Sequence, residues 1–281
     1  MDKFFHAIFF ACGMLSVVFV VGITAYLIAS GMPAIFEIGP IDFLLGQIWI
    51  PGKGQLGILP FIITSLYGTL GALLVSLPLG ICTAVFLSKY AGCRSGYIIR
   101  SAVELLAGIP SVVYGLVGMI VLVPAIQSAF GLSSGATLLA AIVVLAVMIL
   151  PYIVNVSATA LDAVPKEYEE GLLALGATRT ETYFKVSMRA ARSGIATAII
   201  QGVGRAVGEA MAIIMVAGNV ANMPELLGSV RFLTTAIVSE MSYASWGSLH
   251  REALFSIGLV LFVLIVLVNM LLNVITRRKE D

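Results

Sequence analysis

Six long apolar runs, separated by polar breaks, constrain this chain more than any other feature of its sequence. Each run is long enough, at roughly 20 residues or more, to cross the hydrocarbon core of a bilayer as a helix. Helices suit that environment because each satisfies its own backbone hydrogen bonds. The runs lie near residues 4–28, 58–87, 102–126, 136–156, 195–220 and 253–275. We predict an all-α polytopic membrane protein with six transmembrane helices, forming a single domain over residues 1–281.

The composition and the placement of charge agree with this prediction. Hydrophobic residues make up 60% of the chain and charged residues 11%, whereas a soluble domain carries about 25% charged residues. Twelve of the sixteen lysines and arginines lie in the N-terminus, the 88–101 loop, the 157–192 loop and the C-terminus. Positive charge is retained on the cytoplasmic side of a membrane, so both termini are expected in the cytoplasm.

Several other function classes lack a basis in the sequence. The net charge is +1, and no basic or acidic tract suits nucleic acid. The three cysteines lie far apart, and His6 and His250 lack the spacing of metal ligands. No G-x-x-x-x-G-K-[ST] loop is present to bind ATP. We expect a transport subunit and not an enzyme, with membrane lipid around it and no metal, cofactor or nucleic-acid partner.

The 157–192 loop is the longest polar stretch and predicts two short helices. Pro165 suits the start of the first helix, and Gly176 suits its left-handed C-terminal cap. Thr178 and Glu181 match a capping box for the second helix. The pair could lie on the lipid surface or dock into a partner protein. Acidic residues on the first helix weigh against an anionic lipid surface.

Two segments of this loop, "EGLLALGAT" and "TYFKVSMRAARSG", resemble the EAA loop of ABC-importer permeases. Glu170 and Gly176 match the family pattern at the right separation, whereas its alanines and closing proline are missing here. The resemblance implies the MetI-like permease fold and a prokaryotic inner-membrane location. It also implies that the loop docks on a cytoplasmic ATP-binding subunit, with Glu170, Leu172, Leu173 and Gly176 as the coupling residues.

Three further stretches resemble the permeases of phosphate importers of the PstC type. They read "QIWIPGKGQLGILPFIITSLYGTL", "ELLAGIPSVVYGLVG" and "GVGRAVGEAMAIIMVAGN". The resemblance implies half of a heterodimeric pore, completed by a PstA-like sister permease. It also implies an extracytoplasmic phosphate-binding protein.

Arg205 and Glu209 are the charged residues of the fifth apolar run. Arg205 would lie about 18 Å along the helix, near the bilayer midplane, where a charge costs at least about 2.5–3.5 kcal/mol. Residues four apart share a helix face, so the two could form a self-neutralising ion pair. Alternatively they form a polar spot on a transport path, because a guanidinium matches phosphate oxygens. The PstC-type resemblance implies the second role.

Ser111 and Tyr114, which follow Pro110 in the third run, are weaker candidates for the substrate pathway. Polar residues in membrane helices also serve as hydrogen bonds between helices. Gly204 and Gly208 form a small-xxx-small pair that predicts close approach of another helix, such as one of the sister permease.

The function predicted from these features is that of a permease subunit for ATP-driven phosphate import. Three alternatives remain open at the level of sequence. The first is a permease for another oxyanion, such as sulfate or molybdate. The second is an ATP-independent channel or secondary transporter in which Arg205 and Glu209 form a gating pair. The third is a membrane scaffold or signalling partner without flux.

Overall fold

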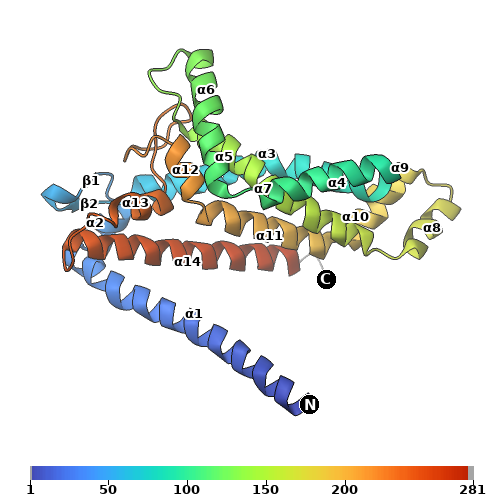
Figure 1. Ribbon diagram of the computed structural model, residues 1–281, viewed down its shortest axis with the longest axis horizontal. Helices are drawn as coiled ribbons and strands as arrows, with labels where there is room; N and C mark the ends of the chain where they lie inside the picture. Colours follow the sequence, from blue (N-terminus) through green and yellow to red (C-terminus); the bar gives the residue numbers. More distant parts are fainter. Residues whose placement is uncertain (1, 278–281) are drawn as a thin grey trace. The chain divides into compact units, whose positions relative to one another are not determined.

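The computed structural model describes residues 2–277, and it is almost entirely helical (Figure 1). Contacts divide the chain into two compact units, which are described separately. The first comprises the residues up to Leu59 together with Ala236–Val263, and the second comprises Pro60–Thr235 and the end of the chain. Two helices, α13 (Leu233–Glu240) and α14 (Leu249–Arg277), contribute residues to both units.

The first unit holds the long helix α1 (Asp2–Ile38), the short helix α2 (Pro40–Leu45) and a small hairpin. Strands β1 (Trp49–Ile50) and β2 (Gln55–Leu56) pair antiparallel, with Trp49 opposite Leu56, around the 3-10 turn η1 (Pro51–Lys53). Trp49 is buried and donates a 3.0 Å hydrogen bond from Nε1 to Glu240 Oε2, which also lies 2.7 Å from His250 Nε2. The Trp49 side chain therefore contributes to the packing of this unit.

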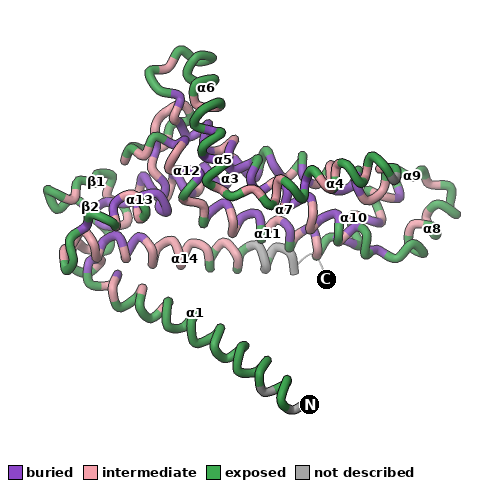
Figure 2. The backbone as a smooth tube through the Cα atoms, in the orientation of Figure 1, coloured by how far each residue is buried: buried purple, intermediate pink, exposed green. Residues whose placement is uncertain are grey.

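The second unit is built around α7 (Leu138–Asp162), which is among its most buried helices (Figure 2). Helices α3 (Leu59–Val85), α4 (Cys93–Gly108) and α11 (Arg192–Gly208) pack on it. Glycines allow two of these close approaches. A Cβ added at Gly194 of α11 would clash with the Ala160 side chain, and one at Gly80 of α3 would lie 2.7 Å from Ile153.

Two of the six predicted spans are interrupted, which corrects the sequence-based boundaries. The 102–126 run contains the end of α4 at Gly108, followed by α5 (Ser111–Val117), the π-helical turn η3 (Gly118–Leu122) and α6 (Val123–Phe130). The break falls at Ile109 and Pro110, because a proline disfavours helical backbone in the residue before it. The 195–220 run is divided into α11 and α12 (Met211–Val216).

Five helical segments in the described part of the chain are long and apolar enough to cross a bilayer. They are Phe4–Ile38, Leu59–Tyr90, Ser111–Phe130, Leu138–Asp162 and Leu249–Leu271. The α11–α12 segment supplies the remaining apolar run, divided by its break into 17 and 6 helical residues. The structure is thus compatible with the six predicted spans, although it does not show the fifth, residues 195–220, as one continuous helix.

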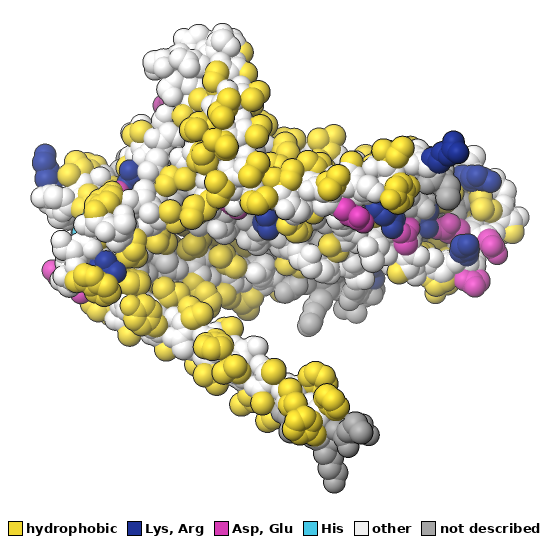
Figure 3. Space-filling view, viewed as in Figure 1, with side chains coloured by type: hydrophobic (Ala, Val, Ile, Leu, Met, Phe, Trp, Pro, Cys, Tyr) yellow, Lys and Arg dark blue, Asp and Glu magenta, His cyan; other side chains and the backbone are white. Residues whose placement is uncertain are grey.

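The predicted cytoplasmic loop folds into short helices as expected. They are α8 (Lys166–Ala174), α9 (Arg179–Thr182), the π-helical turn η4 (Tyr183–Ser187) and α10 (Met188–Ala190). Charged side chains gather around α8 and α9, while α1 presents mainly apolar side chains (Figure 3). Each pattern fits its expected surroundings, water for the loop and lipid for the long helix.

Candidate functional site

Arg205 lies in the last turn of α11 and is half-buried. Its Cζ atom lies 4.4 Å from the centroid of the Tyr152 ring on α7, within the distance at which an aromatic face attracts a cation. Its Nε atom is buried and has no hydrogen-bond partner within the described residues. The guanidinium therefore rests on an aromatic ring and retains at least one unused donor.

Glu209 does not pair with Arg205 among the residues described, so the ion pair considered as an alternative from the sequence is absent. The helix ends at Gly208, and Glu209 has extended backbone angles, with φ −74° and ψ 127°. A continuous helix is required to bring residues four apart onto one face. Glu209 instead accepts a 3.0 Å hydrogen bond from the backbone N–H of Ala212, in the first turn of α12.

Tyr114 and Tyr152 satisfy the open end of α4. The hydroxyl of Tyr114 donates to the Leu106 carbonyl at 2.6 Å, and that of Tyr152 donates to the Ala107 carbonyl at 3.3 Å. Carbonyls of a last helical turn have no partners within the helix, and the Leu106 carbonyl also accepts from the Ile109 N–H at 3.2 Å. Tyr152 thus joins the end of α4 to Arg205 on α11.

The remaining pathway candidate, Ser111, is half-buried at the first position of α5, three residues before Tyr114. The hydroxyls of Tyr114 and Tyr152 donate to adjacent carbonyls of α4, and the Tyr152 ring contacts Arg205. The structure therefore brings Tyr114 and Arg205 into one cluster through Tyr152. Tyr152 is the residue that sequence reasoning missed, and its only signal is a polar aromatic residue next to Pro151 inside an apolar run.

Glycines allow α5 and the following turn η3 to pack closely on α12. A Cβ at Gly115 would lie 2.8 Å from the Ala212 backbone, and one at Gly118 would lie 2.9 Å from Val216. Helical structure is interrupted at Ile109–Pro110 and again at Glu209–Ala210. The helices that follow these two interruptions, α5 and α12, pack closely on each other. In contrast, α7 continues without interruption past Pro151 and Tyr152.

A cavity of about 410 Å³ lies between α5, η3 and α7. Its lining is apolar apart from Tyr114, with Val113, Val117, Val143 and Val147 among its walls. Burying an anion against such a surface without a compensating cation is costly. Of these two places in the second unit, the Arg205 cluster is the one suited to an anion.

The coupling residues predicted from the EAA resemblance lie on α8 and in the turn that follows it. Glu170 and Leu173 are exposed, whereas Leu172 is half-buried. Gly176 has a φ of +86°, so it occupies the left-handed conformation predicted for it, and its N–H donates to the Leu173 carbonyl at 3.0 Å. The exposed side chains leave this surface free for a partner.

The capping box predicted at Thr178 is confirmed. Thr178 Oγ1 accepts from the Glu181 backbone N–H at 3.3 Å, and the Glu181 carboxylate accepts from the Thr178 backbone N–H at 3.1 Å. That backbone bond lowers the pKa of the Glu181 carboxyl, and Lys185 acts in the same direction. Sequence reasoning finds these caps because each depends on residues only three or four apart.

Comparison with known proteins yields a consistent set of relatives. The model of a family described as "Binding-protein-dependent transport system inner membrane component" matches residues 76–281. The chain is 39% identical over 275 residues to a probable ABC transporter permease protein, YqgH, of Bacillus subtilis, with 96% of this chain and 89% of the relative covered. It is 32% identical over 286 residues to the phosphate transport system permease protein PstC of Mesorhizobium japonicum, with coverage of 95% and 87%.

Solved structures share the fold at lower identity. A bacterial alginate ABC transporter, crystallised with an alginate pentasaccharide-bound periplasmic protein, matches with a TM-score of 0.69 and 14% identity, covering 100% of this chain and 96% of that chain. An inward-facing MetNI methionine ABC transporter matches with a TM-score of 0.58 and 20% identity, covering 82% and 96%. At these identities the similarity establishes the MetI-like permease fold.

Proposed function

The chain belongs to the family of binding-protein-dependent transport system inner membrane components, and we propose that it forms one half of the membrane pathway of an ATP-driven phosphate importer. It is a multi-pass ABC-importer permease, a class whose members act with an ATPase and a substrate-binding protein and are not themselves enzymes. The identity of the substrate and of each partner is part of the proposal.

The observation that carries the phosphate assignment is the half-buried Arg205, which has an aromatic neighbour and no paired carboxylate among the described residues. A guanidinium stays charged at physiological pH and offers planar donors that match phosphate oxygens. Burial strengthens such bonds relative to water. The PstC names of relatives such as the Mesorhizobium protein support the same substrate.

In this proposal Arg205 contacts the passing anion, and Glu209 tunes that contact. Glu209 lies four residues further on and holds the first turn of α12 through the Ala212 N–H. When the helices rearrange, its carboxylate becomes free to accept a hydrogen bond from a protonated phosphate or to compete for Arg205. Competition keeps the anion weakly held, as conduction requires. Ser111 and Tyr114 complete the proposed pathway.

The proposed partners are a PstA-like sister permease, cytoplasmic ATP-binding subunits and an extracytoplasmic phosphate-binding protein. On α11, a Cβ at Gly204 or Gly208 would meet no neighbouring atom of the described residues within 4 Å. This open surface is suited to close packing by a helix of the sister permease. Glu170, Leu172, Leu173 and Gly176 are proposed to couple the permease to the ATPase.

The test is phosphate uptake by the complete transporter reconstituted in vesicles, with Arg205→Gln and Arg205→Lys as variants and Lys53→Gln in the exposed hairpin as control. Loss of one charge-assisted hydrogen bond of about 1.5–3 kcal/mol predicts a reduction of roughly tenfold to a hundredfold for Arg205→Gln. Arg205→Lys should retain part of the activity because it keeps the charge.

Uptake at the wild-type rate by an Arg205→Gln complex of normal composition would overturn the assigned role. Sulfate and molybdate are added as competitors in the same assay. If either anion displaces labelled phosphate at equal concentration, the chain is a permease for a broader or different set of oxyanions and not a phosphate importer. Flux without ATP would instead support a channel or secondary transporter.

A further inference from the structure

Three consecutive residues at the end of the second apolar segment contact the coupling loop and the end of α7. They lie in the π-helical turn η2 (Phe86–Tyr90), which continues α3. Lys89 Nζ lies 2.6 Å from Glu169 Oε1 on α8, and the Tyr90 hydroxyl lies 3.0 Å from Thr180 Oγ1 on α9. Ser88 Oγ donates to Asp162 Oδ1, at the end of α7, at 2.6 Å. We call residues 88–90 the η2 anchor.

The ion pair between Lys89 and Glu169 is shielded from water. Their side chains are 11% and 16% exposed, and the fully buried Ser187 donates to the same Glu169 oxygen at 2.8 Å. By contrast, the Lys185–Glu181 pair of the same loop is 65% and 46% exposed. Exposed pairs contribute little, whereas removing one partner of a buried pair leaves an uncompensated charge. The two pairs are therefore chemically alike but energetically different.

The η2 anchor matters because α8 has no buried residue of its own. A helix that buries no residue against the rest of its chain gains little from packing there, so its position depends on polar contacts and on its connections. The inward contact is made by Glu169, next to the exposed Glu170 of the EAA-like pattern. Glu169 thus contacts the rest of the permease, whereas its neighbour Glu170 is exposed on the surface of α8.

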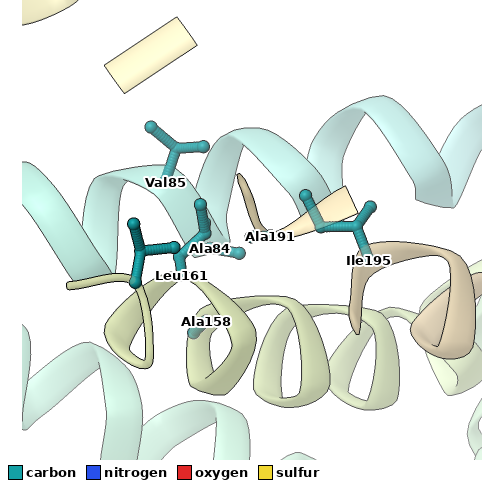
Figure 4. Packing of buried hydrophobic residues seen from close by; sticks show 7 residues of the cluster. Ala84, Val85, Ala158, Leu161, Ala191 and Ile195 are labelled. Carbon is teal, nitrogen blue, oxygen red and sulfur yellow. The ribbon is translucent and has the colours of Figure 1, made fainter. Parts of the chain in front are cut away.

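The η2 anchor is continuous with a packed apolar core. Ala84 and Val85, at the end of α3, pack with Ala158 and Leu161 of α7 and with Ile195 of α11 (Figure 4). Within the turn itself, Leu87 packs with Val103 of α4 and Val154 of α7. The same two helices, α7 and α11, carry Tyr152 and Arg205.

We infer that Lys89 and Glu169 are positioning residues that transmit movement of α8 into the membrane helices, so that the loop and the Arg205 site move together. The inference deepens the proposed function and rests on it for the direction of the movement. When the ATPase displaces α8, the shielded ion pair pulls on the turn that ends α3. The close packing of α3, α7 and α11 then carries the displacement toward Arg205, because packed interiors transmit strain.

The test measures phosphate taken up per ATP hydrolysed by the complete transporter in vesicles. Lys89→Met and Glu169→Gln are expected to lower this ratio by about tenfold while ATP hydrolysis continues. Each substitution removes one member of the shielded ion pair and leaves the charge of the other without its partner. Lys185→Met removes the matched exposed pair and should change the ratio by less than about twofold. The double exchange Lys89→Glu with Glu169→Lys should recover part of the lost coupling.

Hydrogen–deuterium exchange of residues 166–174 in the assembled detergent complex provides a second readout that does not depend on the substrate. Lys89→Met should accelerate exchange in α8, whereas Lys185→Met should not. An unchanged uptake-to-ATP ratio, or unchanged α8 exchange, in both Lys89→Met and Glu169→Gln would overturn the inference. Failure of the wild-type complex to take up phosphate, with accelerated α8 exchange in these variants, would overturn the substrate proposal alone. If Lys89→Met does not assemble, Lys89→Arg tests the same pair, and normal α8 exchange together with normal coupling is expected for it.

Discussion

At the scale of single residues, Tyr152 is informative because its ring and its hydroxyl make separate contacts. Its ring supports the Arg205 guanidinium, and its hydroxyl donates to the Ala107 carbonyl at the end of α4. The first contact bears on the charge in the proposed pathway, and the second bears on the helix break. Tyr152→Phe removes only the hydroxyl, whereas Tyr152→Leu removes both the hydroxyl and the aromatic ring.

We predict that Tyr152→Phe retains most phosphate uptake, because the ring that faces Arg205 remains. Tyr152→Leu should reduce uptake by roughly twofold to thirtyfold, since a cation–π contact is worth about 0.5–2 kcal/mol. Uptake by both variants in reconstituted vesicles, normalised to the amount of assembled complex, checks this. Equal losses in the two variants would show that the hydroxyl and not the ring matters.

At the scale of elements, the glycines of α11 fall into two classes. Gly194 and Gly202 pack against α7, where an added Cβ would clash with Ala160 in the first case and lie 3.3 Å from Ile153 in the second. An added Cβ at Gly204 or Gly208 would meet no neighbouring atom within 4 Å in the described part of the chain. Gly194 and Gly202 thus belong to the interface between α11 and α7, whereas Gly204 and Gly208 belong to a surface of α11 that no described residue covers.

Gly194→Ala is predicted to lower the free energy of unfolding by about 1–3 kcal/mol, because the added methyl overfills a packed contact. Gly204→Ala should not lower it and can raise it by up to about 1 kcal/mol through helix propensity. Thermal unfolding of the purified chain in detergent measures both. Equal melting temperatures for the two variants would contradict this assignment of packing.

At the scale of the whole molecule, the distribution of lysine and arginine predicts which loops meet the cytoplasm. Within the second unit, charged side chains gather on α8 and α9 (Figure 3). In the first unit, Lys53 is exposed in the hairpin turn and belongs to the loops that are poor in positive charge. The proposed topology therefore places Arg179 inside and Lys53 outside.

This topology is tested by labelling single cysteines with a membrane-impermeant maleimide. Lys53→Cys should react in intact cells, and Arg179→Cys should react only in inverted vesicles. Both are placed in a background where Cys12, Cys82 and Cys93 are serine. Labelling of Arg179→Cys in intact cells would place the coupling loop outside and exclude contact with a cytoplasmic ATPase.

The sequence alone was sufficient for the features that depend on near neighbours or on average composition. The apolar runs require a membrane because no soluble core could bury them. The Thr178 capping box and the left-handed Gly176 follow from residues a few positions apart, and the structure has both as predicted.

The tertiary structure decided what depends on partners far apart in the chain. An apolar run does not reveal where a helix stops, so the break at Gly208 and the resulting separation of Arg205 from Glu209 escaped the sequence pattern. Tyr152 meets Arg205, and Lys89 meets Glu169, only because packed helices bring distant positions together. Local spacing determines caps and helix faces. The partner of a buried charge, and its shielding from water, exist only after the helices have packed.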